Sequence, residues 1–356
     1  MEKRNDYIDA VRGVAALFVI WGHTFFYIGM WFLPDWFKSF GLLFEVPVFF
    51  LLSGWAAGLR PLSVKKTLHS VFRLWLQWIF FITVLALACF FSRFTSLPLE
   101  GVSGPVDLIK NYAMIVSFPA LPVVEGSVWF LPLFMLTSLF CVAVLKLMEK
   151  AGSGGKSKAV FLVILIIVTV LLSVLRAAGK NPVPQILQSV VFYGIFWMMG
   201  YLRKSIRIDS LFKCLGFAAA GLVGYMVTAR LMGFRFFVVQ DAKFPPVLPY
   251  ACWACMSVAV VFYLEQKMKR FHPFLLHVGK NAIFYYFAQG VSTSLLCKVE
   301  GKLLTDHWVL KWALFVVLNI LVAIPIAEML RVVYQAWSGL LRRIRSADKD
   351  KPKINP

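Results

Sequence analysis

The sequence predicts an all-α protein that crosses a membrane many times. Of its 356 residues, 60% are apolar and only 15% are charged, whereas roughly a quarter of an ordinary soluble domain is charged. The apolar residues form runs of about 20, the length that a helix needs to span a bilayer. The basic residues, which produce a net charge of +20, lie in short clusters between these runs. This pattern indicates contact with the lipid bilayer, and no nucleic-acid partner is expected.

Ten apolar runs are predicted to be membrane-spanning helices. They cover residues 7–30, 41–58, 73–93, 127–146, 159–176, 185–202, 212–230, 248–266, 279–297 and 309–338. If the N-terminus is placed on the cytoplasmic side, 25 of the 37 Lys and Arg residues fall at inner positions and 11 at outer positions. The remaining one, Arg12, lies within the first span. This bias predicts that both termini are cytoplasmic. Residues 1–340 are expected to form one transmembrane domain, and residues 341–356 a charged, disordered cytoplasmic tail.

The first span carries three ionisable side chains, Asp9, Arg12 and His23, on one stripe. At about 100° per residue, Arg12 and His23 return to within roughly 20° of one another, and Asp9 lies about 40° beyond. About 16 Å of helix axis separates Arg12 from His23. Because an ionisable group costs at least ~2.5 kcal/mol inside a bilayer, the stripe predicts a functional site. Two alternatives stay open: an Asp9–Arg12 ion pair that reaches the headgroups, and a neutral His23 bonded across a helix interface.

The second span has Glu45 at its outer end and Ser53-Gly54 toward its inner end. Counting from the outer boundary puts Glu45 at a depth similar to that of His23, where a carboxylate orients an imidazole and supports its charged form. The alternative is a glutamate exposed at the outer interface. Ser53 either donates a hydrogen bond to a ligand or, with Gly54, allows close helix packing.

The inner loop 60–73 is basic and weakly amphipathic, with Arg73 at its end. Such a segment anchors a chain to anionic lipid. It would equally suit the phosphates of a cytosolic cofactor, because Arg offers bidentate contacts to phosphate.

The longest outer connection, 94–126, is predicted to hold a short helix over 107–117 and to lead to Trp129 at the outer interface. Trp129 fits either an aromatic belt or a binding loop. In the ninth span, Tyr285 and Gln289 share a helix face and either line a polar cavity or bridge two helices.

Two apparent motifs are rejected. The glycine-rich inner loop 151–157 fits no phosphate-binding loop, because Lys150 occupies the place of the first required glycine and no strand precedes it. Cys252 and Cys255 form a C-x-x-C within a membrane helix, without a second pair or a histidine at ligand spacing. No metal site is predicted.

The motifs resemble those of membrane-bound acyltransferase family 3, the family of bacterial surface-polysaccharide O-acetyltransferases. The similarity rests on Arg12 and His23 with ten residues between them, and on Asp9-x-x-Arg-Gly, Phe49-Phe-x-x-Ser-Gly54, Trp129-Phe-Leu131 and Gly279-Lys-Asn281 in order. It covers roughly residues 5–338, the whole membrane region.

The resemblance implies a multi-pass transferase of the bacterial cytoplasmic (inner) membrane. Such an enzyme takes an acyl group, commonly acetyl, from cytosolic acyl-CoA and places it on a hydroxyl of a glycan or lipid-linked sugar. Arg12 and His23 correspond to the family's required pair. Arg73 matches the second member of a basic pair that follows the second span, whereas Ser70 replaces the first. Glu45 and Gln289 stand where relatives have histidine, and these departures indicate a different acceptor.

The expected chemistry assigns a role to each candidate. His23 is the general base, because a histidine with an ordinary pKa near 6.5 suits the deprotonation of an alcohol near neutral pH. Asp9 is expected to orient Arg12, and Glu45 to orient the imidazole of His23 and support its charged form. The donor-binding residues are expected to be Arg12, Ser53 and Arg73, and the acceptor-binding residues Trp129, Tyr285 and Gln289.

Two other functions are compatible with the sequence. An exporter or carrier of polysaccharide or lipid-linked sugar would also place charged residues within ten spans. A scaffold whose polar residues only pack against one another is the third class. A homo-oligomer is compatible with each of them.

Overall fold

The computed structural model of this protein describes residues 5–94, 99, 101–102, 104–152, 156–300 and 307–349. The predicted all-α membrane class is confirmed, because these residues form helices without strands and seven of the helices are long and apolar enough to cross a bilayer. The α-helices are α1 (Asp6–His23), α2 (Asp35–Phe40), α3 (Val46–Gly58), α4 (Val64–Ser92), α5 (Pro105–Tyr112), α6 (Pro122–Ser127), α7 (Phe130–Lys150), α8 (Lys156–Ala177), α9 (Gln185–Tyr201), α10 (Leu211–Leu231), α11 (Leu248–Lys267), α12 (Pro273–Lys280), α13 (Ala282–Cys297) and α14 (Trp308–Lys349).

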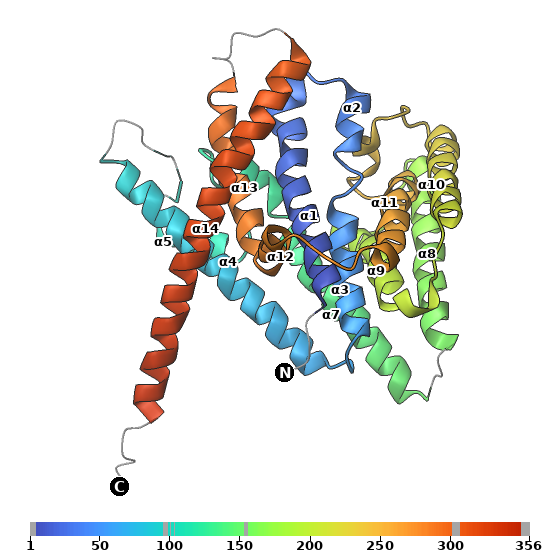
Figure 1. Cartoon of the computed structure of the whole chain (residues 1–356), viewed down its shortest axis with the longest axis horizontal. Coiled ribbons are helices and arrows are strands. Elements are labelled where there is room, and N and C mark those ends of the chain that lie inside the picture. Colours follow the sequence, from blue (N-terminus) through green and yellow to red (C-terminus); the bar gives the residue numbers. More distant parts are fainter. Residues whose placement is uncertain are drawn as a thin grey trace.

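Each of the ten predicted spans contains a helix, but three of these helices are short. α3 has 13 residues, α13 has 16 and α9 has 17, against the roughly 20 that a full crossing requires. Ten crossings and cytoplasmic termini therefore stay predictions. The start of α1 and the end of α14 lie toward the same side of the molecule (Figure 1).

Helix boundaries differ from the predicted ones where capping residues decide them. The second span begins at Val46 instead of residue 41, because Pro47 favours the first turn of a helix. The third span begins at Val64 instead of residue 73, so most of the predicted inner loop is the first part of α4. Ser63 caps this helix by accepting a hydrogen bond from the amide of Lys66. The chain between the first two spans contains α2, which periodicity over so few residues could not predict.

Two further expectations need correction. The short outer helix predicted over 107–117 is α5, which starts at Pro105 and ends at Tyr112. The tail predicted to be disordered from residue 341 continues α14 as far as Lys349, because extending an existing helix costs far less than starting one. Residues 350–356 of that tail, and parts of the 94–126 and 151–157 loops, lie outside the described residues.

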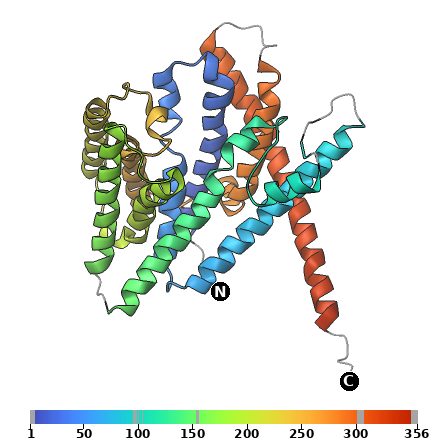
Figure 2. The same ribbon diagram turned by 180° about the vertical axis from the view of Figure 1, so that it is seen from behind.

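α1 stands at the centre of the bundle, between α3 on one side and α12, α13 and α14 on the other (Figure 1). Seen from behind, α4 and α7 run diagonally across the molecule (Figure 2). Two apolar cores meet at α1: one joins it to α3, α7, α9 and α11, and the other to α4, α13 and α14. α1 therefore has neighbours on most of its circumference, and its polar residues face protein.

Glycines bring the helices of the site together. A Cβ at Gly279 of α12 would overlap the carbonyl oxygen of Asp9, and one at Gly13 of α1 would overlap the carbonyl oxygen of Leu275. Gly54 likewise lies against the backbone of Trp197 in α9. The Asp-x-x-Arg-Gly and Gly-Lys-Asn motifs are thus two halves of one backbone contact, which holds α1 directly on α12.

We expect Gly279→Ala to lower the free energy of unfolding by about 1–3 kcal/mol, because its methyl group has no room against α1. Thermal unfolding in detergent measures the change. Gly216→Ala is the matched control: Gly216 lies in α10 with open space around it, so alanine there should be neutral or stabilise by up to about 1 kcal/mol. Equal unfolding temperatures for the two variants would show that the α1–α12 contact is not tight.

Candidate functional site

α1, with the short π-helix (Thr24–Ile28) and 3₁₀ turn (Gly29–Trp31) that follow it, presents one line of residues to two cavities. The inner cavity contacts Ile8, Asp9, Arg12, Ala16 and Val19, and the outer cavity contacts Val19, His23, Phe26, Tyr27 and Met30. Apart from the adjacent pairs Ile8/Asp9 and Phe26/Tyr27, these positions recur at steps of three or four residues, the period of one helix face. The structure thus brings the predicted polar stripe to one side of α1, with Arg12 in one cavity and His23 in the other.

The inner cavity has a volume of about 870 Å³ and is strongly basic. Three arginines, Arg12, Arg60 and Arg73, and one carboxylate, Asp9, line it, a net charge of +2. Asp9 is buried and forms an ion pair with Arg12 at 3.2 Å. The wall also contains Ser53 from α3, together with apolar side chains of α7 and α13. An excess of arginine in a concave site favours an anionic ligand such as a phosphate group.

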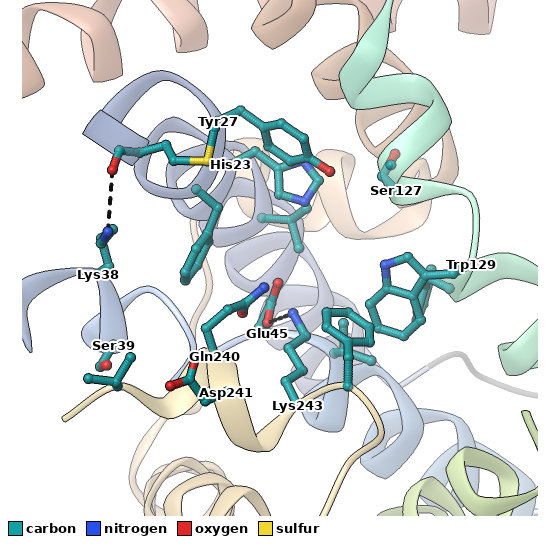
Figure 3. A pocket seen from close by; sticks show the side chains of 18 of the residues that line it. His23, Tyr27, Lys38, Ser39, Glu45, Ser127, Trp129, Gln240, Asp241 and Lys243 are labelled. Carbon is teal, nitrogen blue, oxygen red and sulfur yellow. Dashed lines mark hydrogen bonds and ion pairs between the residues drawn. The ribbon is translucent and has the colours of Figure 1, made fainter. Parts of the chain in front are cut away.

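The outer cavity has a volume of about 660 Å³ and a balanced set of charges. Its charged lining residues are three carboxylates and three cations: Asp35, Glu45, Asp241, Lys38, Arg235 and Lys243. His23 and Tyr27 lie on one side of this cavity, and Glu45, Lys243 and Trp129 lie across from them (Figure 3). The end of α1 with the turns that follow it, the start of α3 and the loop between α10 and α11 contribute most of its lining, and residues of α2, α6, α7, α9 and α13 complete it.

The two cavities adjoin. Val19, Phe49, Phe130 and Tyr286 line both of them. The Phe130 ring lies 5.7 Å from the Phe49 ring and 5.4 Å from the Tyr286 ring, centroid to centroid. A ligand that extended from one cavity into the other would pass between these side chains.

A hydrogen bond from Nδ1 of His23 to Oε1 of Gln289 orients the imidazole. Because an amide oxygen only accepts hydrogen bonds, Nδ1 carries the proton and Nε2 of the neutral ring keeps its lone pair. The Tyr27 ring packs against the imidazole with centroids 5.3 Å apart. The second nitrogen of His23 is therefore the one that can accept a proton.

Asn319 of α14 fixes the helices that carry this histidine and its glutamine partner. The two N–H donors of its amide are shared among the carbonyl of Ile20 at 3.2 Å, Thr24 at 3.1 Å and Thr293 at 2.9 Å, and its oxygen accepts from Ser292 at 2.6 Å. Asn319 is fully buried, and α1 changes at Thr24 from an α-helix to a short π-helix. The network sets the register of α1, α13 and α14 at the depth of the imidazole.

Glu45 and Lys243 form a buried ion pair of 2.6 Å, with side chains 4% and 5% exposed. The Lys243 ammonium also lies 5.4 Å from the ring centroids of Trp129 and Phe244. The predicted contact of Glu45 with the imidazole is absent: His23 donates to Gln289 of α13, and the Glu45 carboxylate accepts from Lys243.

The rim of the outer cavity is tied together by further ion pairs. Lys38 contacts Asp35 at 2.8 Å, and Arg235 lies 3.7 Å from both Asp35 and Asp241. The hydrogen bond from Lys38 lowers the pKa of Asp35, and the charge of Arg235 adds to the effect. Each cation of this cavity is thus matched to a carboxylate.

Most of the predicted residues meet in this pair of cavities. Asp9, Arg12, Ser53 and Arg73 line the inner cavity, whereas His23, Glu45 and Trp129 line the outer one. Gln289 reaches the site by its bond to His23. Among the described residues no three His, Cys, Asp or Glu side chains lie close enough together to hold a metal ion.

Tyr285 lies elsewhere. Its hydroxyl donates to Glu328 of α14 at 2.8 Å, in a cluster with His277 and Arg331. The neighbouring Tyr286 lines both cavities instead, because a shift of one residue turns a helix by about 100°. Sequence reasoning also missed Lys243, since nothing local distinguishes it from other lysines of the outer loops.

Comparison with known proteins identifies one family. The model of an acyltransferase domain matches residues 5–328. No curated protein and no solved structure matches.

We expect Asn319→Leu to lower the free energy of unfolding by about 1–3 kcal/mol for each buried polar group that it leaves unpaired. The same change should lower any activity that depends on the position of the His23 imidazole. Thermal unfolding in detergent measures the first effect. Thr169→Val is the matched control, because the buried Thr169 hydroxyl has no hydrogen-bond partner among the described residues. A smaller loss in the leucine variant than in the valine variant would contradict the network.

Proposed function

This chain belongs to acyltransferase family 3, whose model matches residues 5–328, and from that membership we propose that it carries an acyl group across the membrane. The donor is acyl-CoA, most simply acetyl-CoA, from the cytosol. The acceptor is a hydroxyl of a cell-surface or periplasmic glycan, or of a lipid-linked sugar. The enzyme acts in the cytoplasmic membrane of a bacterium as an O-acyltransferase.

The observation that carries the proposal is the position of Arg12 and His23 in two adjoining cavities on one face of α1. About 16 Å of helix axis lies between them, a length of the same order as an extended pantetheine arm. A donor held by its phosphates in the inner cavity would bring its thioester to His23 between Phe49, Phe130 and Tyr286.

The inner cavity has the charge that a CoA nucleotide needs. Arg12 and Arg73 offer guanidinium groups to its phosphates, and the ion pair with Asp9 holds Arg12 in one orientation. Ser53 lies on the same wall and offers a hydroxyl to the arm. Ser70 also lines this cavity but carries no charge, so Arg73 is the main contact from α4 to the phosphates.

The outer cavity has the groups that acyl transfer needs. Nε2 of His23 takes the proton of the acceptor hydroxyl as that oxygen attacks the thioester carbon, and the proton then passes to the departing thiolate. Gln289 keeps the imidazole in the required tautomer. Holding both reactants in one cavity removes several kcal/mol, at most about 11, from the barrier. An acyl-histidine intermediate would use the same imidazole.

The acceptor side of the cavity is aromatic and polar. Trp129 offers a ring face, and Glu45 offers a carboxylate that accepts hydrogen bonds from hydroxyl groups. Gln240 and Asp241 add further polar groups at the mouth (Figure 3). Such a combination of a ring and hydrogen-bond acceptors suits a sugar.

We expect His23→Gln to lower kcat for acetyl transfer by about 10²–10⁴-fold, the usual contribution of a general base. Release of the CoA thiol by the purified protein, in the presence of acceptor, measures it. His69→Gln is the control, because His69 is an exposed histidine of α4. Full turnover by the His23 variant would remove this residue from the mechanism, and transport of intact sugar without consumption of acetyl-CoA would favour a carrier.

We expect Arg73→Gln to raise the KM for acetyl-CoA by roughly tenfold with little change in kcat, because a charge-assisted hydrogen bond to phosphate is worth about 1.5–3 kcal/mol. Arg93→Gln, at the opposite end of the same helix and outside both cavities, should leave KM unchanged. A KM that rises equally in both variants would indicate a general effect of charge instead of a phosphate contact.

A further inference from the structure

Lys243 is the most buried cation of the outer cavity. Its side chain is 5% exposed, compared with 17% for Lys38 and 71% for Arg235. Its ammonium makes one hydrogen bond within the part of the chain that the structure describes, to Glu45. An ammonium group carries three N–H donors, so two of them remain for a ligand in the cavity.

The loop around Lys243 is held rigidly. The guanidinium of Arg176, at the end of α8, donates to the carbonyl oxygens of Pro245, Asp241 and Phe244. Gln188 donates to the carbonyl of Pro246 at 3.2 Å. One arginine thus binds three carbonyls within a five-residue stretch and keeps the lysine on the cavity wall.

Stability alone does not account for the Glu45–Lys243 pair. Removing two charges from water costs several kcal/mol per ion, and a buried ion pair can often be replaced by apolar residues without loss. The pair instead faces His23 across the cavity (Figure 3). It provides one fixed charge of each sign at the place where the proposed reaction separates charge.

The charges that develop in acyl transfer match this pair. The acceptor oxygen bonds to the thioester carbon as its proton moves to His23, which makes the imidazole positive and the former carbonyl oxygen negative. The electrons on that oxygen then re-form the C=O bond, the C–S bond breaks, and the proton passes from His23 to the thiolate. The products are an ester and the CoA thiol.

We infer that Lys243 is a catalytic residue whose ammonium donates a hydrogen bond to the thioester carbonyl oxygen as that oxygen becomes negative, a role that rests on the proposed acyl transfer. Glu45 holds the ammonium in place and offsets the positive charge of the imidazole. Donors fixed before the reaction begins stabilise an oxyanion most when the site excludes water, and removal of one typically costs about 10²–10³-fold in kcat.

The test measures thiol release from acetyl-CoA by the full-length protein in detergent, with a panel of p-nitrophenyl glycosides as acceptors. Lys243→Met should lower kcat by about 10²–10³-fold while the KM for acetyl-CoA changes less than about threefold, and Lys243→Arg should recover at least about tenfold of the loss. Lys311→Met is the matched control: Lys311 pairs with Glu300 at 2.7 Å and lies 4.6 Å from the Phe32 ring centroid, outside the cavity.

The outcomes separate the two proposals. A kcat for Lys243→Met within about threefold of the parent, or a rise in acceptor KM alone, would overturn the oxyanion role and leave acyl transfer standing. If His23→Gln releases the CoA thiol as fast as the parent protein does, both proposals are overturned. If Lys243→Met fails to fold because Glu45 is left unpaired, the double variant Glu45→Gln/Lys243→Met removes both charges and should show the same loss of kcat.

Discussion

The polar stripe of α1 cannot face lipid, and the rest of the structure follows from this constraint. An Asp9, Arg12 or His23 side chain exposed to hydrocarbon would cost several kcal/mol, so α1 must be enclosed by other helices. The bundle encloses it between two apolar cores, which leave two adjoining cavities along the stripe.

Close helix contacts allow this enclosure. Gly13 and Gly279 let α1 and α12 meet backbone to backbone, and Gly54 does the same for α3 and α9. Apolar side chains provide no hydrophobic driving force between helices within lipid, so small residues and interhelical hydrogen bonds hold a membrane bundle together. The Asn319 network adds such hydrogen bonds at the depth of His23, where an error in helix register would move the imidazole most.

The two cavities of the site differ in charge. Arginines exceed carboxylates in the inner cavity, whereas every cation of the outer cavity lies beside a carboxylate. In the proposed function, the inner cavity would attract a CoA nucleotide, whereas the balanced charges of the outer cavity would give it no net attraction. This difference would orient the donor, with its phosphates in the inner cavity and its thioester near His23.

The sequence alone determined the helical class and the shared face of Asp9, Arg12 and His23, because apolar run length and a 3.6-residue period are local properties. The glycines of the two motifs were visible in the sequence, but their contact between α1 and α12 was not predicted from it. Only the tertiary structure decided which side chains meet across helices. Gln289 rather than Glu45 bonds His23, Tyr286 rather than Tyr285 reaches the cavities, and Lys243 joins Glu45 from 198 residues away. Each of these contacts depends on the rotation and register of two packed helices or on the path of a loop, which no local pattern contains.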